Sequence, residues 1–464
     1  MKRLIAATLV LVLLSAGALA AVASSVNKSK DTLTYTESVL YGDPSIIEGA
    51  VVSGVLHYQN RLVWNTSYRF GIGTESSFKY HFTKHYANGK PLLPGFILGN
   101  DIGMGFDYRK PASEQSGISK IYKELYDSLD YGEQGEMTVR LADVYEYYPL
   151  RININLPKVS WSANTEHGIR IGNVGTPEEH EADQRIYDDI CEFFKIPMLD
   201  SEYVDITVNK HNSGSVGFGH GLSDKNKDTF SIQSRSAYTD GVCYIALNNR
   251  TEQGSIMDFG NIPGGYGIYA LPYGYRTIKT DELSTVYKLD DKAQINHLAV
   301  SDDQSKLLIT LYEDGISYLE VVDIKSMTRL QKLPIAEGAH GIVLPRDGFT
   351  VYVFNNHIAV ITESEGIYSL ALIAEKFPAN TDTDFFSVRS ATALDFDGER
   401  LVMVDNTYFA NEWVEKCGFY AAVYTSDGLR YFGKYTSSLD ANFGASTKYT
   451  FNCATLTPFS VKLK

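Results

Sequence analysis

One unit recurs four times along this chain: an apolar strand, an acidic turn and a second apolar strand. The copies are Ser236–Asn249, His297–Thr310, His340–Asn355 and Ala391–Asn406. Each turn begins with an aspartate, and the intervals between these aspartates are 63, 44 and 50 residues. A β-rich unit that returns about every 40–50 residues is typical of folds built from repeated four-stranded blades. The recurrence therefore constrains the fold strongly and the chemistry hardly at all.

Strands that alternate at this spacing need their edges covered, and a ring of blades covers them by radial repetition. We therefore expect an all-β fold, a β-propeller of seven four-stranded blades, with six or eight left open. The four repeats supply four blades, residues of about 50–110 and 135–215 two more, and the remaining strands a seventh. The alternative is a pair of β-sandwiches, whose strands would not carry such a period. We expect one propeller domain over residues 49–464, preceded by a lead-in segment, residues 24–48.

Two amphipathic helices are expected as insertions between strands. The first lies near residues 113–130, where apolar side chains from Ile118 to Leu129 recur at helical spacing. The second lies near 177–196, where Thr176-Pro177-Glu178-Glu179 combines a capping box with proline at the first helical position.

The two ends of the expected ring also read as strands. Residues 33–41 of the lead-in form a strand that is available to pair with a C-terminal strand. The last residues, 459–463, alternate between apolar and polar side chains, which predicts a terminal strand with one buried face.

The N-terminus predicts export. Lys2 and Arg3 precede an apolar run from Leu4 to Leu19, and Ala18-Leu19-Ala20 matches a signal-peptidase cleavage pattern. Residues 1–23 are therefore a cleaved signal peptide or, because the apolar segment is long enough to span a bilayer, an uncleaved membrane anchor. Both alternatives place the body of the chain outside the cytoplasm, secreted, on the cell surface or in the periplasm.

The net charge narrows the class of partner. A formal charge of -14 without a basic run does not favour nucleic acid. Contact with a membrane is expected only through the N-terminal segment, if it is uncleaved. We expect a monomer with no cofactor and no resident metal.

Two of the repeats resemble a known type of repeat. Asn296–Asp303 with Lys306–Thr310, and Gly338–Ile342 with Val351–Asn355, resemble YVTN-type, lactonase-like (WD40-like) β-propeller repeats. The likeness covers residues of about 230–440 and departs from the repeat at Gln304, where the repeat has glycine. It implies a ring of four-stranded blades and no catalytic residues, because that superfamily includes enzymes and binding proteins alike.

Two histidines stand at equivalent places in successive repeats. His297 and His340 each precede an inner strand, a position near one mouth of a propeller's central channel. Two imidazoles there would serve a ligand site, and the alternative is that each makes only a local structural contact. The third equivalent position is near Ser390, so a ring of histidines does not continue.

The densest aromatic run extends from Gly264 to Tyr275. Exposed on a rigid rim, its tyrosines would stack on sugar faces or anchor a peptide. The alternative is an ordinary strand whose tyrosines span core and water. The candidate binding residues of this run are Tyr266, Tyr269, Tyr273 and Tyr275.

The four cysteines form no CxxC motif. Export permits disulfides, and Cys417 with Cys453 is the favoured pair because both fall in the last blade region. The other pairings, and four buried thiols, stay open.

Three catalytic or metal motifs fail on inspection. The calcium-like spacing of Asp224, Asn226 and Asp228 lacks the following glycine and the later glutamate. His180-Glu181 begins a zinc motif, but Gln184 replaces its second histidine. Ser215 stands in an incomplete nucleophile elbow because Ser213 replaces the first glycine.

These observations favour an exported, non-enzymatic propeller that binds a protein, peptide or glycan, or that acts as a scaffold at the bacterial envelope. The alternative is a carbohydrate- or lactone-directed enzyme on the same scaffold.

Overall fold

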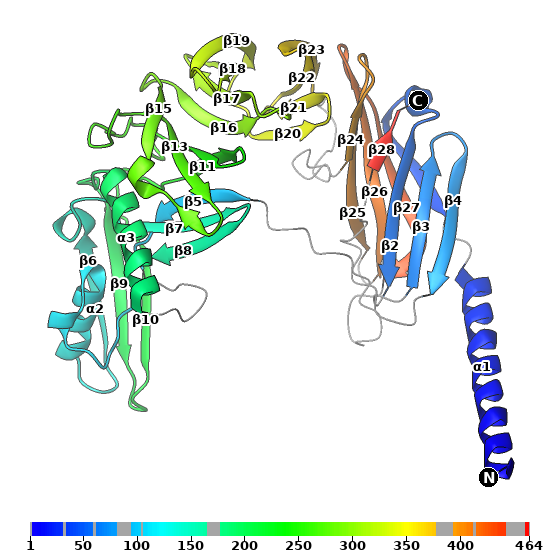
Figure 1. Ribbon diagram of the computed structural model, residues 1–464, viewed down its shortest axis with the longest axis horizontal. Helices are drawn as coiled ribbons and strands as arrows, with labels where there is room; N and C mark the ends of the chain where they lie inside the picture. The colour runs from blue at the N-terminus through cyan, green and yellow to red at the C-terminus, as the bar shows by residue number, and fades with distance from the viewer. Residues whose placement is uncertain are drawn as a thin grey trace. The chain divides into compact units, whose positions relative to one another are not determined.

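The computed structural model describes residues 2–30, 34–58, 62–80, 94–103, 105–164, 177–376, 393–411, 414–441 and 460–463 (Figure 1). The chain divides into two compact units: residues 92–338, and residues 1–91 with 339–464. Each unit has buried apolar clusters of its own. The prediction of one domain over residues 49–464 stays a prediction.

The unit of residues 92–338 is built from antiparallel sheets, the first two of which interleave along the chain. One has the strands β5 (Gly95–Asn100), β7 (Leu150–Leu156) and β8 (Val159–Asn164). A second orders β10 (Val216–Leu222), β9 (Tyr203–Lys210) and β6 (Gln134–Arg140). A third orders β11 (Ser234–Tyr238), β12 (Val242–Leu247) and β13 (Gly267–Gly274), to which β14 (Thr277–Ile278) and β15 (Ser284–Lys288) both pair. The fourth is a meander of β16 (Gln294–Val300), β17 (Lys306–Glu313), β18 (Ile316–Asp323) and β19 (Thr328–Glu337).

Three of these sheets meet through their first strands. Ser236 and Ser234 on β11 accept hydrogen bonds from the backbone N–H groups of Phe96 and Leu98 on β5, each at 2.8 Å. Arg235 Nε, also on β11, donates to the carbonyl oxygen of Asn296 on β16 at 3.2 Å. Successive sheets joined at their inner strands are arranged as the blades of a propeller are. The polar side chains of β11 thus hold the first strands of neighbouring sheets together.

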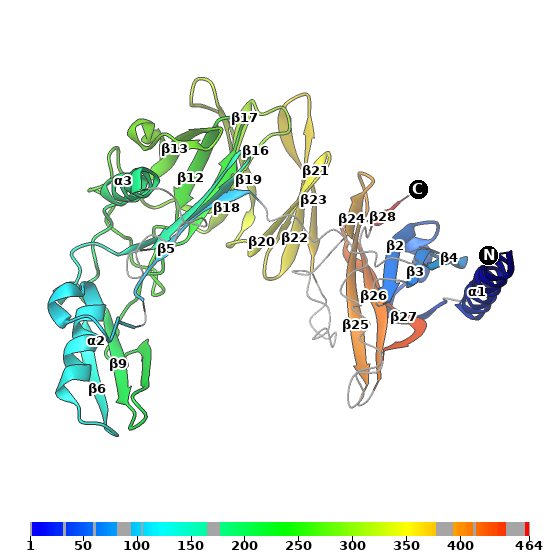
Figure 2. The ribbon, with the colours of Figure 1, turned by 60° about the horizontal axis from the view of Figure 1, so that its bottom comes forward.

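Two helices accompany these sheets. The helix α2 (Gly117–Ser128) lies against β6 and β9 in both views (Figures 1 and 2). Its buried Tyr122 donates a hydrogen bond to the carbonyl oxygen of Gly219 on β10 at 2.9 Å. The helix α3 (Pro177–Phe193) ends beside Phe194, whose ring meets that of Tyr269 edge to face at 5.1 Å. Short 3-10 helices fill the connections η2 (Ala112–Glu114), η3 (Leu141–Asp143) and η4 (Thr280–Glu282).

The other unit holds three sheets. One is the meander β20 (Ile342–Arg346), β21 (Phe349–Val353), β22 (His357–Ser364) and β23 (Ile367–Glu375). The next orders β1 (Tyr35–Gly42), β27 (Gly428–Ala441), β26 (Val414–Thr425), β25 (Leu401–Asn411) and β24 (Ala393–Phe396). The last orders β28 (Ser460–Lys462), β2 (Val51–Tyr58), β3 (Leu62–Arg69) and β4 (Gly73–Tyr80). The 3-10 helix η1 (Pro44–Ile47) joins β1 to β2.

Both ends of the chain enter these sheets as strands. The lead-in strand β1 pairs antiparallel with β27, and the terminal strand β28 pairs with β2. Val461 in β28 is buried, as the alternation of the last residues predicts. N-terminal and C-terminal segments therefore complete sheets whose other strands lie far away in sequence.

The four predicted strand–turn–strand units are confirmed. They form the hairpins β11–β12, β16–β17, β20–β21 and β24–β25, each the start of its sheet. The acidic residues act as turn formers: Asp303 accepts hydrogen bonds from the Ser301 hydroxyl and from the Ser305 hydroxyl and backbone N–H, which hold the pKa of its carboxyl well below the usual range. The blade count stays a prediction.

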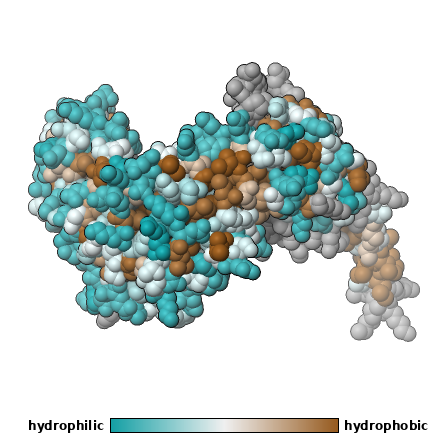
Figure 3. Space-filling view, turned by 90° about the horizontal axis from the view of Figure 1, so that it is seen from above, coloured by the Kyte–Doolittle hydropathy of each residue, from teal (hydrophilic) through white to brown (hydrophobic). Residues whose placement is uncertain are grey.

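The N-terminal segment forms the helix α1 (Lys2–Lys30), and its apolar side chains between Leu9 and Val22 are exposed (brown, lower right in Figure 3). Among the parts of the chain that the structure describes, no helix has both the length and the apolarity needed to cross a membrane.

Candidate functional site

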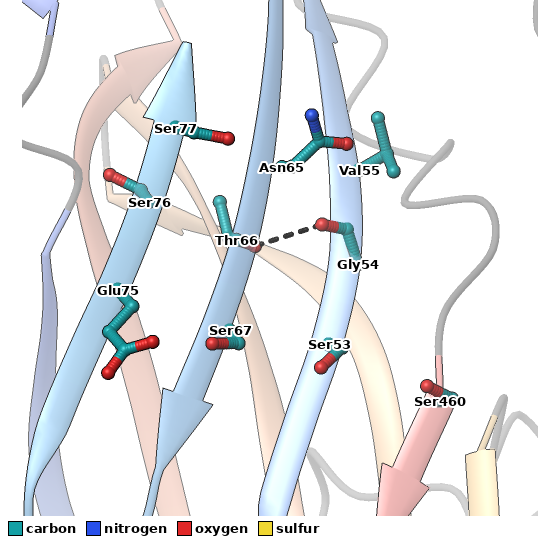
Figure 4. A pocket seen from close by; sticks show the side chains of 10 residues that line it. All are labelled: Ser53, Gly54, Val55, Asn65, Thr66, Ser67, Glu75, Ser76, Ser77 and Ser460. Atoms are coloured by element: carbon teal, nitrogen blue, oxygen red, sulfur yellow. Dashed lines mark hydrogen bonds between the residues drawn. The ribbon is translucent and has the colours of Figure 1, made fainter.

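A polar trough lies on the sheet β28-β2-β3-β4. Its volume is about 520 Å³ (Figure 4). Four serines, Ser53, Ser67, Ser77 and Ser460, lie on one face of the sheet. Asn65 and Glu75 lie on the same face. The lining residues are Ser53, Gly54, Val55, Asn65, Thr66, Ser67, Glu75, Ser76, Ser77 and Ser460.

The register of the sheet arranges these side chains in rows. Ser53 pairs with Ser460 on one side and with Ser67 on the other, and Ser67 pairs with Glu75. A second row runs from Val55 through Asn65 to Ser77. Because side chains alternate between the two faces of a strand, both rows project from the same face.

The opposite face of this sheet is part of a hydrophobic core. Val52, Tyr68 and Val461 are buried there, together with Phe419 and Tyr435 of the neighbouring sheet. Thr66 also turns inward: it is 7% exposed, and its hydroxyl donates to the carbonyl oxygen of Gly54 at 3.2 Å, the dashed line in Figure 4. The core thus fixes the sheet, and the serine rows are left for the outer face.

The chemistry of the trough is that of hydrogen bonding to a polar ligand. Hydroxyls both donate and accept, an amide offers two donors and an acceptor, and a carboxylate accepts. Asn65, Glu75, Ser77 and Ser460 are exposed, and Ser53 and Ser67 are half-buried. No motif in the sequence indicates this site. The available signal was serine and asparagine at alternating positions, at Ser53, Asn65, Ser67 and Ser77.

A second pocket, of about 540 Å³, lies beside the end of α3. Several of its charged side chains already have partners: Lys195 bonds to Glu192 and lies over the Tyr147 ring, and Asp189 accepts from the Thr280 hydroxyl. These pairs lock α3 to its surroundings.

His297 lies on β16 and is half-buried. Burial and the nearby Arg235 guanidinium lower the pKa of its imidazole to about 4. The ring is therefore neutral at physiological pH. His340 is buried against the rings of Tyr352 and Phe354, with centroid distances of 5.5 and 5.9 Å. The two histidines belong to different compact units.

The tyrosine run lies mostly inside the fold. Tyr266, Tyr269 and Tyr273 are buried, and their hydroxyls bond to backbone groups of Ile295, Gly265 and Thr239 respectively. Only Tyr275 among the four candidates has an exposed ring, at 72%. The expectation of an exposed aromatic rim is thus corrected for the three buried rings: β13 is a central strand, paired on both sides, so its side chains pack into the core.

Of the cysteines, Cys191 and Cys243 have free thiols, and burial raises the pKa of each. The predicted Cys417–Cys453 disulfide lies outside what the structure describes.

The calcium-like loop is a turn in which the acids bond to the protein itself. Asn226 exchanges hydrogen bonds with the backbone of Tyr203, and Asp228 accepts from the Thr251 hydroxyl and the backbone N–H of Gln253. Within the described residues, no three His, Cys, Asp or Glu side chains gather closely enough to hold a metal ion.

Glu202 is one of the buried carboxylates, with Glu320 and Asp405. Glu202 accepts hydrogen bonds from the Tyr148 hydroxyl at 2.5 Å and from the Phe230 N–H at 2.9 Å, and burial raises its pKa. Both carboxylate oxygens are thereby occupied by the fold.

No protein-family model and no curated protein matches this chain. Solved structures do match it. The N-terminal domain of Nup159 is 9% identical with a TM-score of 0.25, over 50% of this chain and 57% of that chain. The chain thus spans little more than half of that domain. The beta-propeller domain of Cps50 (Swd1) from Myceliophteria thermophila is 9% identical with a TM-score of 0.25, over 53% of this chain and 84% of that chain.

The periplasmic gluconolactonase of Pseudomonas aeruginosa is 10% identical, with a TM-score of 0.25, over 86% of this chain and 82% of that chain. TM-scores of this size carry no conclusion about fold, activity or ligand. The description of the fold rests on the strand order and on the hydrogen bonds between the first strands of the sheets.

Proposed function

We propose that this protein is an exported, non-enzymatic β-propeller that binds a glycan in the trough on sheet β28-β2-β3-β4. The observation that carries the proposal is the pair of outward rows, in which hydroxyl, amide and carboxylate groups repeat at strand spacing. Sugars present hydroxyls at short, regular intervals, and such rows offer each hydroxyl a donor and an acceptor. A protein or a peptide is the alternative partner class, and it would leave the glycan array without a ligand.

Export is part of the proposal and rests on the N-terminal sequence. The positive residues, the apolar run and the cleavage pattern support a secreted, surface or periplasmic location, with residues 1–23 cleaved or retained as a tether. Monomeric state is proposed with it.

The enzymatic alternative is less well supported at this site. Glycoside hydrolysis generally uses two carboxyl groups on either side of the bond that is cleaved. Among the residues that line the trough, Glu75 alone carries a carboxylate. A binding role requires no second carboxylate.

The test is a glycan array followed by calorimetric titration with the best ligand. Asn65→Ala and Ser67→Ala should each weaken binding by roughly two- to tenfold, the value of one net hydrogen bond. Tyr275→Ala, a change at an exposed position of the other unit, is the control and should leave binding unchanged. Release of reducing sugar during the titration would contradict the non-enzymatic role, and absence of glycan binding would contradict the proposal as a whole.

A further inference from the structure

The trough has a basic border. Val51 on β2 pairs with Lys462 on β28 and with Arg69 on β3. These positions lie two residues from Ser53, Ser460 and Ser67, so their side chains project from the same outer face. The third row of this face is therefore Lys462, Val51 and Arg69.

The spacing makes this row part of one binding surface. Two residues along a strand advance about 6–7 Å, so the cationic row lies next to the serine row. Lys462 and Arg69 are separated by one intervening strand, about 9–10 Å at the backbone. An extended chain lying across the strands would meet hydroxyls along one edge and cations along the other.

The charges of the surface are not balanced. Neither Arg69 nor Lys462 forms an ion pair with another described residue, and Lys462 is exposed. Glu75 is the single acid of the rows, diagonal to Arg69 across the β3–β4 pairing. Two cations against one carboxylate give a locally positive face on a chain whose formal charge is -14. That sign is opposite to the rest of the molecule, which indicates a specific anionic ligand rather than general attraction.

We propose, on the basis of the proposed function, that the ligand is an acidic glycan bearing carboxylate or sulfate groups. The serine and asparagine rows hold its hydroxyls. Arg69 receives an anionic group through its planar guanidinium, which matches two oxygens at once, and Lys462 receives the next as a point charge. Glu75 opposes the anion and limits affinity.

The experiment compares acidic and neutral polymers of similar sugars on the full chain. Polygalacturonate and dextran sulfate should bind, and fully methyl-esterified pectin and dextran should bind at least tenfold more weakly. Binding of the acidic polymers should fall as salt rises, because exposed charges are screened. Equal binding of acidic and neutral polymers would overturn the inference while leaving the glycan-binding function intact.

Three substitutions should change the affinity for polygalacturonate in directions that a neutral ligand would not produce. Arg69→Gln and Lys462→Gln should each weaken binding of polygalacturonate by five- to tenfold. Glu75→Gln, which keeps the hydrogen-bonding shape and removes only the charge, should strengthen it by two- to fivefold. Lys288→Gln, an equal loss of charge at an exposed position of β15, is the control and should have no effect. A weakening by Glu75→Gln would overturn the inference.

A polyanion without sugar-ring hydroxyls on its surface tests whether the protein recognises the sugar or only the negative charge. Double-stranded DNA of matched length should bind at least tenfold more weakly than polygalacturonate, and equal binding would overturn the assignment to a glycan. If none of these polymers binds but the glycan array finds another ligand, the inference fails and the proposed function stands; if the array also finds no ligand, the proposed function fails.

Discussion

At the scale of single residues, the position after the turn aspartate decides how each repeat turns. Gly241, Gly348 and Gly398 have φ of 115°, 79° and 102°, a region that glycine occupies without a steric cost. Gln304 takes the same place at φ 58°. Its side chain explains the exception, because Gln304 Oε1 accepts a hydrogen bond from the backbone N–H of Asp240 at 3.0 Å. Backbone strain at this turn is offset by a bond to the tip of the preceding repeat.

This balance predicts different results for two substitutions. Gln304→Ala keeps the strain and loses the bond, so it should lower the free energy of unfolding by about 1 kcal/mol. Gln304→Gly loses the bond but relieves the strain, so the two effects should cancel to within about 0.5 kcal/mol. Urea denaturation of both variants measures the difference. Equal destabilisation would show that φ is not strained at this turn.

His297 predicts a dependence of stability on pH. Its pKa is about 4 in the fold, below the usual value near 6.5, so the unfolded chain binds the extra proton between these values. Stability contributed by the neutral ring is complete above pH 6.5 and is lost as the pH falls towards 4, by up to about 3 kcal/mol. His297→Gln should flatten this part of the stability profile. An imidazole NMR resonance titrating near pH 6.5 would contradict the argument.

Removal of the Tyr269 ring and removal of the Tyr275 ring should have different effects on the free energy of unfolding. Tyr269 is fully buried and meets Phe193 and Phe194 edge to face, so Tyr269→Ala should destabilise the fold by about 3–5 kcal/mol. Tyr275→Ala, on an exposed ring, should stay within about 0.5 kcal/mol. Chemical denaturation compares them. A stable Tyr269→Ala protein would mean that this ring is not part of the core.

At the scale of elements, one carboxylate ties strand β1 to β27 in addition to their backbone pairing. Glu37 Oε1 accepts hydrogen bonds from the hydroxyls of Tyr431 and Tyr435 on β27, at 2.7 and 2.8 Å. Burial raises the pKa of both tyrosines, which therefore act only as neutral donors to Glu37. The lead-in segment is thus an integral strand of this sheet.

Removing the carboxylate should loosen this strand. Glu37→Ala should cost about 1–3 kcal/mol, because two buried hydroxyls lose a charged acceptor. Glu37→Gln retains an acceptor of the same shape and should cost less. Val39→Ala, at another exposed position of the same strand, is the control. Hydrogen exchange of the β1 and β27 amides measures the loosening, and unchanged protection in Glu37→Ala would contradict it.

The two helices were predicted correctly because each has a strong local pattern of residues. The helices predicted near 113–130 and 177–196 are α2 and α3, and α2 contains the predicted apolar stripe except for Leu129. The limits differ by a few residues. The chain becomes extended at Leu129, and α3 ends at Phe193 although the Phe194 N–H still donates to the Ile190 carbonyl oxygen at 3.0 Å. Their status as insertions in a propeller stays a prediction.

At the scale of the whole molecule, the two units have separate cores. The largest apolar cluster uses buried residues between Phe96 and Val322, and the other two use residues outside 92–338. Units with separate cores unfold in separate steps unless their interface is large. Calorimetry should therefore show two transitions, with Tyr269→Ala lowering one and Glu37→Ala the other. One transition that moves in both variants would instead support the predicted single domain over residues 49–464.

The sequence by itself determined the hairpins, the two helices and the terminal strands, because strand alternation, helical spacing and turn residues are local properties of a chain. It also determined the fold-level resemblance, since repeats preserve those local patterns. Only the tertiary structure decided which polar residues meet. Tyr266 and Tyr269 looked like a binding rim and are core, while Ser53, Ser67, Asn65 and Glu75, which no motif connects, lie together. Burial and cross-strand pairing join residues that are distant in sequence, and spacing along the chain carries no record of either.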